Sequence, residues 1–273
     1  MSEPATWSMV LSGEELYLLA GLLQTGTLIG IRDPFPGLLA DEMEERLEQA
    51  KKSLSDQGVL KERPGKELII DSGVAVVVRA ITSANHLLVA VLSLDHHTSH
   101  LLIHSASDIA VEQAVLPSGD IALTAVRDAQ ALKERLEDFF GLSEATETTV
   151  LASRLALSEA DFAQVQHLAQ ERDDRALRDL LRHKGVPPET ISALAAALGE
   201  GQQVISIAVL HRSAQEMRYG ETLAWLVGGQ GAWQVQSLEQ DQAGAVCLTP
   251  TTTAEIKQRI AQMVATLYQG VNA

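Results

Sequence analysis

The sequence predicts an α+β fold made of two related halves, each with a helical bundle and an antiparallel sheet of about four strands. The order of helices, then strands, then a closing helix occurs twice along the 273 residues. The expected strands are joined by short connections, whereas a parallel crossover needs about a dozen residues or more. The two halves also end in similar sequences, which indicates an internal duplication with a pseudo-twofold axis. We expect residues 1–142 and 150–273 to form one integrated domain.

The first half opens with elements in the order of a winged helix. Ser12 and Glu15 have the spacing of a capping box, and leucines follow them at helical period. A second helix is expected over about 38–56. A short hairpin with Pro64-Gly65 in its turn follows, and residues 71–81 are expected to form a third helix.

Strands dominate the rest of the first half. Four segments are rich in apolar and β-branched residues, which is typical of strands that pack on a core. They cover residues 86–94, 100–105, 108–116 and 120–125, and a helix is expected to follow over about 128–140. The polar residues 143–149 are expected to link the two halves.

The second half begins with three expected helices. Ser158 caps the first, Gly185 ends the second, and Pro187-Pro188 starts the third, because proline is favoured in the first turn of a helix. Four strands are then expected over residues 203–211, 221–228, 232–238 and 245–249, with a last helix over about 252–268.

The similarity between the halves is clearest in the last strand and the last helix of each. Residues 119–124 read Gly-Asp-Ile-Ala-Leu-Thr, and residues 244–249 read Gly-Ala-Val-Cys-Leu-Thr. In the helices that follow, Leu-Lys-Glu-Arg-Leu at 132–136 corresponds to Ile-Lys-Gln-Arg-Ile at 256–260. The matched apolar positions are those that would pack a strand and a helix onto a sheet. A chance match between short amphipathic stretches is the alternative.

The charge balance argues against nucleic acid and membrane partners. Acidic residues outnumber basic ones by 36 to 21, and the formal net charge of −15 repels phosphates and anionic lipids. The first 30 residues hold no Lys or Arg, and Glu14 and Glu15 interrupt the apolar stretch, so neither a signal peptide nor a membrane span is expected. We therefore expect a cytoplasmic protein. Cys247 is the only cysteine, and we expect it to be a small core residue.

Several short segments resemble one known family. In the first half they are Trp7, Leu-Ser-Gly-Glu-Glu-Leu at 11–16 and Ser-Leu-Ser-Asp-Gln-Gly-Val-Leu at 53–60. In the second half they are Leu180-Leu181 with Gly-Val-Pro-Pro at 185–188, Gly-Glu-Thr-Leu at 220–223, Gly-Ala-Trp at 231–233 and the closing helix over 256–267. Through these segments and the order of its elements, nearly the whole chain resembles the EspG family, the secretion-associated chaperones of the type VII (ESX) system.

The resemblance implies a quasi-twofold α/β fold and a protein that binds a secretion substrate and keeps it soluble. EspG-like chaperones have no catalytic residues, so we expect neither enzymatic activity nor a cofactor. The implied partner is another protein, usually a PE–PPE pair in the family, and the chain itself is expected to be a monomer or a homodimer. A long loop between early sheet strands helps the family grip its substrate. The matching connection here, Asp-His-His-Thr at 95–98, is short.

Candidate partner contacts lie mainly in the second half. Val186, Ile191 and Leu194 are apolar residues of the helical bundle that could line a groove, and the resemblance points to the same bundle. The alternative is that all three belong to the core. Trp225 and Trp233, on neighbouring strands, are candidate anchors, although aromatic residues also stabilise sheets by packing across strands.

Histidines gather next to the short connection, and two of them, His96 and His97, are further candidate partner contacts. His100 and His104 follow on the next expected strand, where alternation places them on one face. A metal site needs three or four convergent ligands, and solvated histidines on an exposed sheet face are the simpler interpretation, so no metal is predicted. We accordingly expect the change of His100 and His104 to alanine to leave the fold nearly unchanged.

Two other function classes stay open at this point. The winged-helix-like opening would suit a transcriptional regulator or an adaptor. However, its second helix carries acidic residues at 41, 42, 44, 45 and 48 against basic residues at 46, 51 and 52, and reading a DNA groove needs cationic and amide side chains. A small-molecule or metal-dependent enzyme is the last alternative. Asp-His-His at 95–97 occurs in some phosphoesterases, but their further ligands and parallel sheet are not predicted here.

Overall fold

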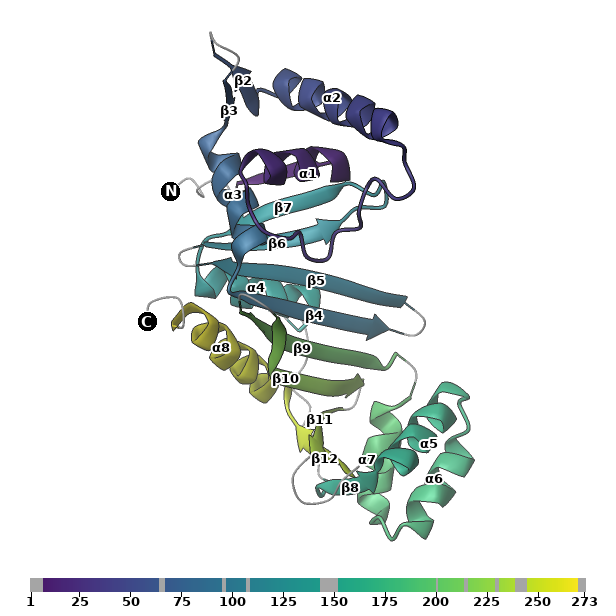
Figure 1. Cartoon of the computed structure of the whole chain (residues 1–273). Coiled ribbons are helices and arrows are strands. Elements are labelled where there is room, and N and C mark those ends of the chain that lie inside the picture. Colours follow the sequence, from purple (N-terminus) through teal and green to yellow (C-terminus); the bar gives the residue numbers. More distant parts are fainter. Residues whose placement is uncertain are drawn as a thin grey trace.

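One ten-stranded antiparallel sheet runs through the molecule and joins the two halves of the chain (Figure 1). This computed structural model describes residues 7–63, 67–94, 97–106, 109–142, 152–199, 201–213, 216–228, 231–238 and 245–269. The strand order is β1-β7-β6-β5-β4-β9-β10-β11-β12-β8, and each neighbouring pair is antiparallel. Helices are segregated from the sheet, which confirms the predicted α+β class.

Each half of the chain supplies five neighbouring strands of the sheet. The first half supplies β1 (Ser8–Leu11), β4 (His86–Leu94), β5 (His97–Ala106), β6 (Ile109–Val115) and β7 (Ile121–Val126). The second half supplies β8 (Leu155–Ser158), β9 (Gln203–Arg212), β10 (Met217–Gly228), β11 (Gly231–Leu238) and β12 (Ala245–Thr251). The sheets of the two halves meet where β4 pairs with β9, so they are one continuous sheet.

The expectation of about four strands per half was wrong by one strand in each half. β1 and β8, the two outermost strands, have four residues each, which is too few for an alternating pattern to stand out in the sequence. Each is paired on one side, β1 with β7 and β8 with β12. Their partners lie about a hundred residues away in sequence, so these strands depend on tertiary pairing.

The first bundle consists of α1 (Gly13–Leu22), α2 (Ala40–Asp56) and α3 (Ser72–Ser83), with the hairpin β2 (Leu60–Glu62) and β3 (Leu68–Ile70) between α2 and α3. The predicted capping box begins α1. The Ser12 hydroxyl accepts the Glu15 N–H at 3.1 Å, and the Glu15 carboxylate accepts the Ser12 N–H at 2.8 Å. The elements follow the predicted order, while a winged-helix packing of them stays a prediction.

The second bundle consists of α5 (Glu159–Gln170), α6 (Asp174–His183) and α7 (Pro188–Ala197). The predicted cap of α5 is present, because the Ser158 hydroxyl accepts the Asp161 N–H at 3.0 Å. Leu177 and Leu181 of α6 and Leu194 of α7 share one core with Leu226 and Trp233 of the sheet. The bundle therefore sits on the β10–β12 end of the sheet.

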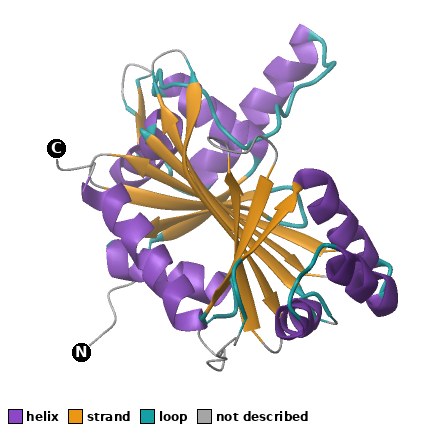
Figure 2. Ribbon diagram, turned by 90° about the horizontal axis from the view of Figure 1, so that it is seen from below, coloured by secondary structure: helices purple, strands orange, loops and turns teal. Residues whose placement is uncertain are grey.

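Helices cover the two faces of the sheet in different places (Figure 2). On one face, α4 (Ala129–Phe139) and α8 (Thr253–Gln269) cover the centre, and they bring in the apolar positions matched between the halves, Leu132, Leu136, Ile256 and Ile260. The two bundles pack on the other face, because neighbouring residues of one strand divide between the cores. Ala110 packs with α4 and Val111 with the first bundle, and Trp225 packs with α8 and Leu226 with the second.

Candidate partner-binding surface

Between the two bundles, the central strands leave one face of the sheet partly exposed. In β9, Ile205, Ile207 and Val209 are buried beneath α4 and α8. Their neighbours Ser206, Ala208 and Leu210 point to the other face and are partly exposed. In β4, Val89 and Val91 are partly exposed in the same way, while Leu88 and Ala90 are buried. These exposed-side residues belong to neither bundle core.

We call this surface the open face, and it comprises Val89, Val91, Ser206, Ala208, Leu210, Tyr219 and Thr222. Its residues form rows across the sheet, because directly paired residues of neighbouring strands share a face. One row runs from Leu102 through Val89 and Ala208 to Thr222. The next row places Val91 between His100 and Ser206. These small, mostly apolar side chains make a surface that suits the apolar end of a helical partner.

Tyr219 supplies the largest exposed side chain of the open face. Its side chain is 81% exposed, and the residue pairs with Leu210 of β9. The register of the β9–β10 pair shifts between Tyr219 and Thr222, as a β-bulge would cause, and such bulges re-aim side chains beside functional sites. An exposed tyrosine next to an apolar surface is a typical anchor for a protein partner.

The loop between α1 and α2 bounds the open face on the side of the first bundle. Gln113 donates to the Ile29 carbonyl at 3.3 Å and its amide oxygen lies 3.0 Å from His104 Nε2. Gly30 has a φ of +74° and lies against Leu102, where an added Cβ would be 2.5 Å from the Leu102 Cδ1. Only glycine fits this close approach without strain, so the loop passes tightly over the end of the row.

His104 is buried, although the sequence predicts that it is exposed. It shares a face with His100 and Leu102, as alternation predicts, but its side chain is fully buried while His100 is exposed. The loop between α1 and α2 and the helix α3 cover His104, and no pattern in β5 itself reveals this cover. Burial, and secondarily the charge of Arg212, lowers the pKa of His104 to about 4, although the hydrogen bond to Gln113 acts in the opposite direction.

We expect acid to destabilise the protein through His104. Its pKa is depressed in the folded state, so its stability contribution is complete above the unfolded value of about 6.5 and is lost as the pH falls toward 4. One pKa unit corresponds to about 1.4 kcal/mol, so the loss amounts to about 3 kcal/mol. Urea unfolding at pH 7 and at pH 4.5 measures it, with His104→Gln as the matched variant. Equal losses of stability in both proteins would contradict the prediction.

The structure places the predicted contact residues of the second bundle inside its core. Val186, Ile191 and Leu194 are 7%, 2% and 0% exposed, so the core alternative describes them. The prediction that these residues line a groove for a partner was wrong, because buried side chains cannot contact a partner. Any contribution of this bundle to binding comes from its exposed residues.

The two tryptophans are also core residues, and they lie on opposite faces of the sheet. Trp225 packs with α8, whereas Trp233 faces Leu226 and packs with the second bundle. The two tryptophans lie on adjacent strands, but Trp233 is paired with Leu226 and not with Trp225, so their side chains point to opposite faces. The tryptophans therefore form no cross-strand pair with each other, and the prediction that they anchor a partner was wrong because both are buried. Cys247 is buried in β12 as predicted.

The connection of β4 to β5 is as short as the sequence indicated, because Leu94 pairs directly with His97. His97 is exposed at the start of β5, and His96 lies outside the described residues. Within the described ranges no three His, Cys, Asp or Glu side chains converge as metal ligands. The sequence suggests that an exposed face of the sheet near the second bundle takes part in binding, but it does not identify the residues of the open face. The alternation in β9 was the available signal, but it does not tell which face the helices cover.

Comparison with known proteins agrees with this architecture. A family model described as the EspG family matches residues 12–262 of the chain. The chain belongs to the EspG family. Among solved structures, EspG5, the type VII secretion system chaperone of Mycobacterium tuberculosis, in complex with a PE25–PPE41 dimer, is similar. It shares 14% sequence identity with a TM-score of 0.63, over 95% of this chain and 96% of that one. No curated protein matches the chain.

The family assignment confirms the resemblance seen in the sequence, and the similarity to EspG5 is a similarity of fold. Nearly the whole length of each chain is covered, so both halves and both bundles have counterparts in that structure. In the part of the chain that the structure describes, no helix is both long and apolar enough to cross a membrane.

Proposed function

We propose that the chain is a type VII secretion chaperone that holds a PE–PPE-like protein pair on its open face. Membership of the EspG family supports the chaperone role, and the similar EspG5 is recorded in complex with such a pair. The observation that carries the proposal is the open face, a partly exposed and mostly apolar surface between two helical bundles. Large exposed apolar surfaces on a protein mark sites for partners.

The physical task of such a chaperone is to cover an apolar end of its partner. Val89, Val91, Ala208 and Leu210 offer apolar area that a helical tip can bury, and Tyr219 offers an aromatic anchor at its edge. The formal charge of −15 keeps the complex soluble because like-charged complexes repel one another.

Several finer properties belong to the same proposal. We propose that residues 1–142 and 150–273 arose by internal duplication and form one integrated pseudo-twofold domain; the matching strand order of the halves supports this. We also propose a cytoplasmic, non-enzymatic protein, as a monomer or a homodimer, because a chaperone that holds a partner before export acts on that side and needs no chemistry. The regulator and enzyme alternatives have no specific observation in their favour.

Tyr219 gives a direct test of the proposed site. Tyr219→Ala is expected to weaken partner binding at least about tenfold, because an exposed aromatic anchor loses its contact area. The partner is first captured from the native host and identified by mass spectrometry, and its affinity is then titrated with purified proteins.

Val10→Ala is the control, since Val10 is also an exposed apolar residue but lies on β1, at the outer edge of the sheet and away from the open face. A partner that is not a PE–PPE-type pair would overturn the proposed substrate class. Equal weakening by both variants would overturn the proposed position of the site.

A further inference from the structure

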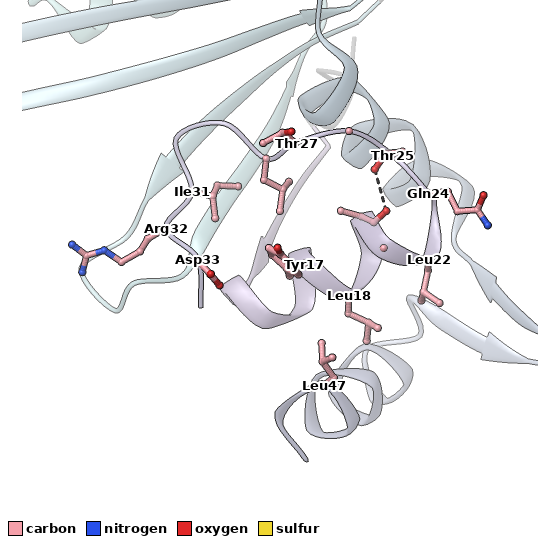
Figure 3. Close-up of a pocket in the computed structure, with 14 residues that line it drawn as sticks. Tyr17, Leu18, Leu22, Gln24, Thr25, Thr27, Ile31, Arg32, Asp33 and Leu47 are labelled. Carbon is pink, nitrogen blue, oxygen red and sulfur yellow. Dashed lines mark hydrogen bonds between the residues drawn. The ribbon is translucent and has the colours of Figure 1, made fainter. Parts of the chain in front are cut away.

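A groove lies between α1, α2 and the loop that joins them, apart from the open face (Figure 3). It has a volume of about 790 Å³. Tyr17, Leu18 and Leu22 of α1 line it from one side, Ile31 from the loop and Leu47 from α2. Tyr17 is 47% exposed and Leu22 is 38% exposed, so the groove is open to solvent. Its size and apolar lining are those of a binding site rather than of a packing defect.

The helix α2 is packed on the body through its C-terminal half only. Of its 17 residues, only Ala50 and Leu54 are buried. Residues 40–46 are all exposed, and Leu39 and Met43 are 72% and 39% exposed. Helices in proteins are stabilised mainly by burial of an apolar stripe. Leu47, in the middle of α2, lines the groove, and Leu39 and Met43 before it stay exposed.

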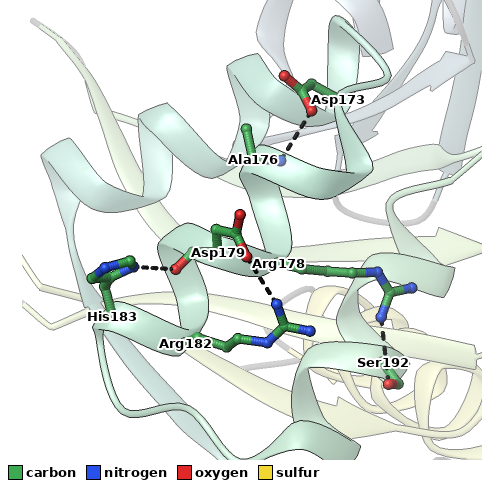
Figure 4. A network of polar contacts seen from close by, with 7 residues as sticks. All are labelled: Asp173, Ala176, Arg178, Asp179, Arg182, His183 and Ser192. Atoms are coloured by element: carbon green, nitrogen blue, oxygen red, sulfur yellow. Dashed lines mark hydrogen bonds and ion pairs between the residues drawn. The ribbon is translucent and has the colours of Figure 1, made fainter.

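The charge of α2 is distinctive within the chain. It carries six carboxylates and three cations. Two of the cations are already paired, Arg46 with Glu14 at 3.1 Å and Lys51 with Glu48 at 3.8 Å. The second helix of the other bundle, α6, has the opposite character, with Arg175, Arg178 and Arg182 along its length. Figure 4 shows Arg178 and Arg182 of this helix. Arg32 and Asp33 are the charged residues that line the groove and offset each other, so the negative surface beside it comes from α2, and it attracts a cationic partner.

From the groove, the partly unpacked α2 and its carboxylates, we propose that the first bundle is a second docking site, which takes a cationic amphipathic helix of another protein. The apolar side of that helix would enter the groove beside Tyr17 and Leu47, with anchors spaced by three or four residues. Its lysines or arginines would face Glu44 and Glu48, which are exposed on the flank of α2, and would compete with Lys51 for Glu48. The groove shares no lining residue with the open face, so the chain could hold two partners at once.

A local probe tests the proposal. Leu22→Cys is labelled with bimane, since Leu22 lines the groove and is exposed, whereas Cys247 is buried and does not react. The ligand is an 18-residue synthetic helix with leucines on one side and lysines on the other. We expect a blue shift of the bimane emission as the peptide covers it, and at least about tenfold weaker binding of the same peptide with glutamate in place of lysine.

Charge reversal supplies the matched pair of variants. Glu44→Lys with Glu48→Lys is expected to invert the preference between the two peptides, whereas Glu171→Lys with Glu189→Lys, at exposed sites of the second bundle, leaves it unchanged. Binding of the lysine peptide without a blue shift places it elsewhere and overturns the proposal. Equal effects of the two double variants overturn it as well. A blue shift that decanoate or anionic vesicles cause, and the peptide does not, would show that the groove takes a lipid instead and would also overturn the proposal.

Discussion

Replacing Ala208 by arginine is expected to weaken partner binding by at least about 100-fold. Ala208 lies in the middle of a row of the open face, between Val89 of β4 and Thr222 of β10. A guanidinium there blocks close approach of an apolar helix tip and loses its hydration if the partner covers it. The fold should survive, because Ala208 is partly exposed and the long side chain can reach solvent.

The affinity of the purified partner, measured by titration, and the melting temperature of the variant together decide this prediction. Thr222→Arg repeats the test at a more exposed position of the same row. Gln236→Arg, at an exposed position of β11, adds the same charge away from the row and should bind normally. Full-strength binding by folded Ala208→Arg and Thr222→Arg proteins would show that the partner docks elsewhere.

Replacing Leu194 by glutamate is expected to cost at least about 4 kcal/mol of stability, enough to unfold the second bundle. Leu194 is fully buried among apolar side chains of α5, α6, α7 and the sheet. A carboxylate there has no cation beside it in the core and leaves a poorly filled space. We therefore expect loss of partner binding together with loss of structure.

Thermal unfolding followed by circular dichroism measures the effect. Ser192→Glu is the control, because Ser192 is exposed on the same helix and lies beside Arg178. The alternative, in which Leu194 lines a groove for the partner, predicts a folded variant that fails to bind. A melting temperature of Leu194→Glu within a few degrees of the wild type would revive that alternative.

The local elements were predictable where short-range patterns specify them. The strand predicted over 86–94 is β4 with the same bounds, and Ser12 and Ser158 cap helices as expected. Caps and alternation act between residues a few positions apart, so the sequence displays them directly. Edge strands were not predictable in this way. The four residues of β1 become a strand because β7 offers them a partner.

The predicted site residues also show that short-range patterns do not decide which side chains are buried. The sequence named Val186, Ile191, Leu194, Trp225 and Trp233 because large apolar residues suit a binding surface, but they suit a core equally well. The open face includes small residues such as Ser206 and Ala208, which do not stand out in a sequence. Alternation along β5 predicts an exposed His104, because nothing in β5 reveals the loop that Gln113 holds over it.

By itself, the sequence determined the order of helices and strands, the α+β class, the acidic surface and the family. Each of these rests on composition or on patterns within a few residues of one another. Only the tertiary structure decided that the two sheets are one, which face of β4 and β9 stays open, and which apolar residues are core. Alternation divides a strand into two faces, but the helices that cover one of them come from distant parts of the chain. Exposure therefore depends on long-range packing, which no local pattern encodes.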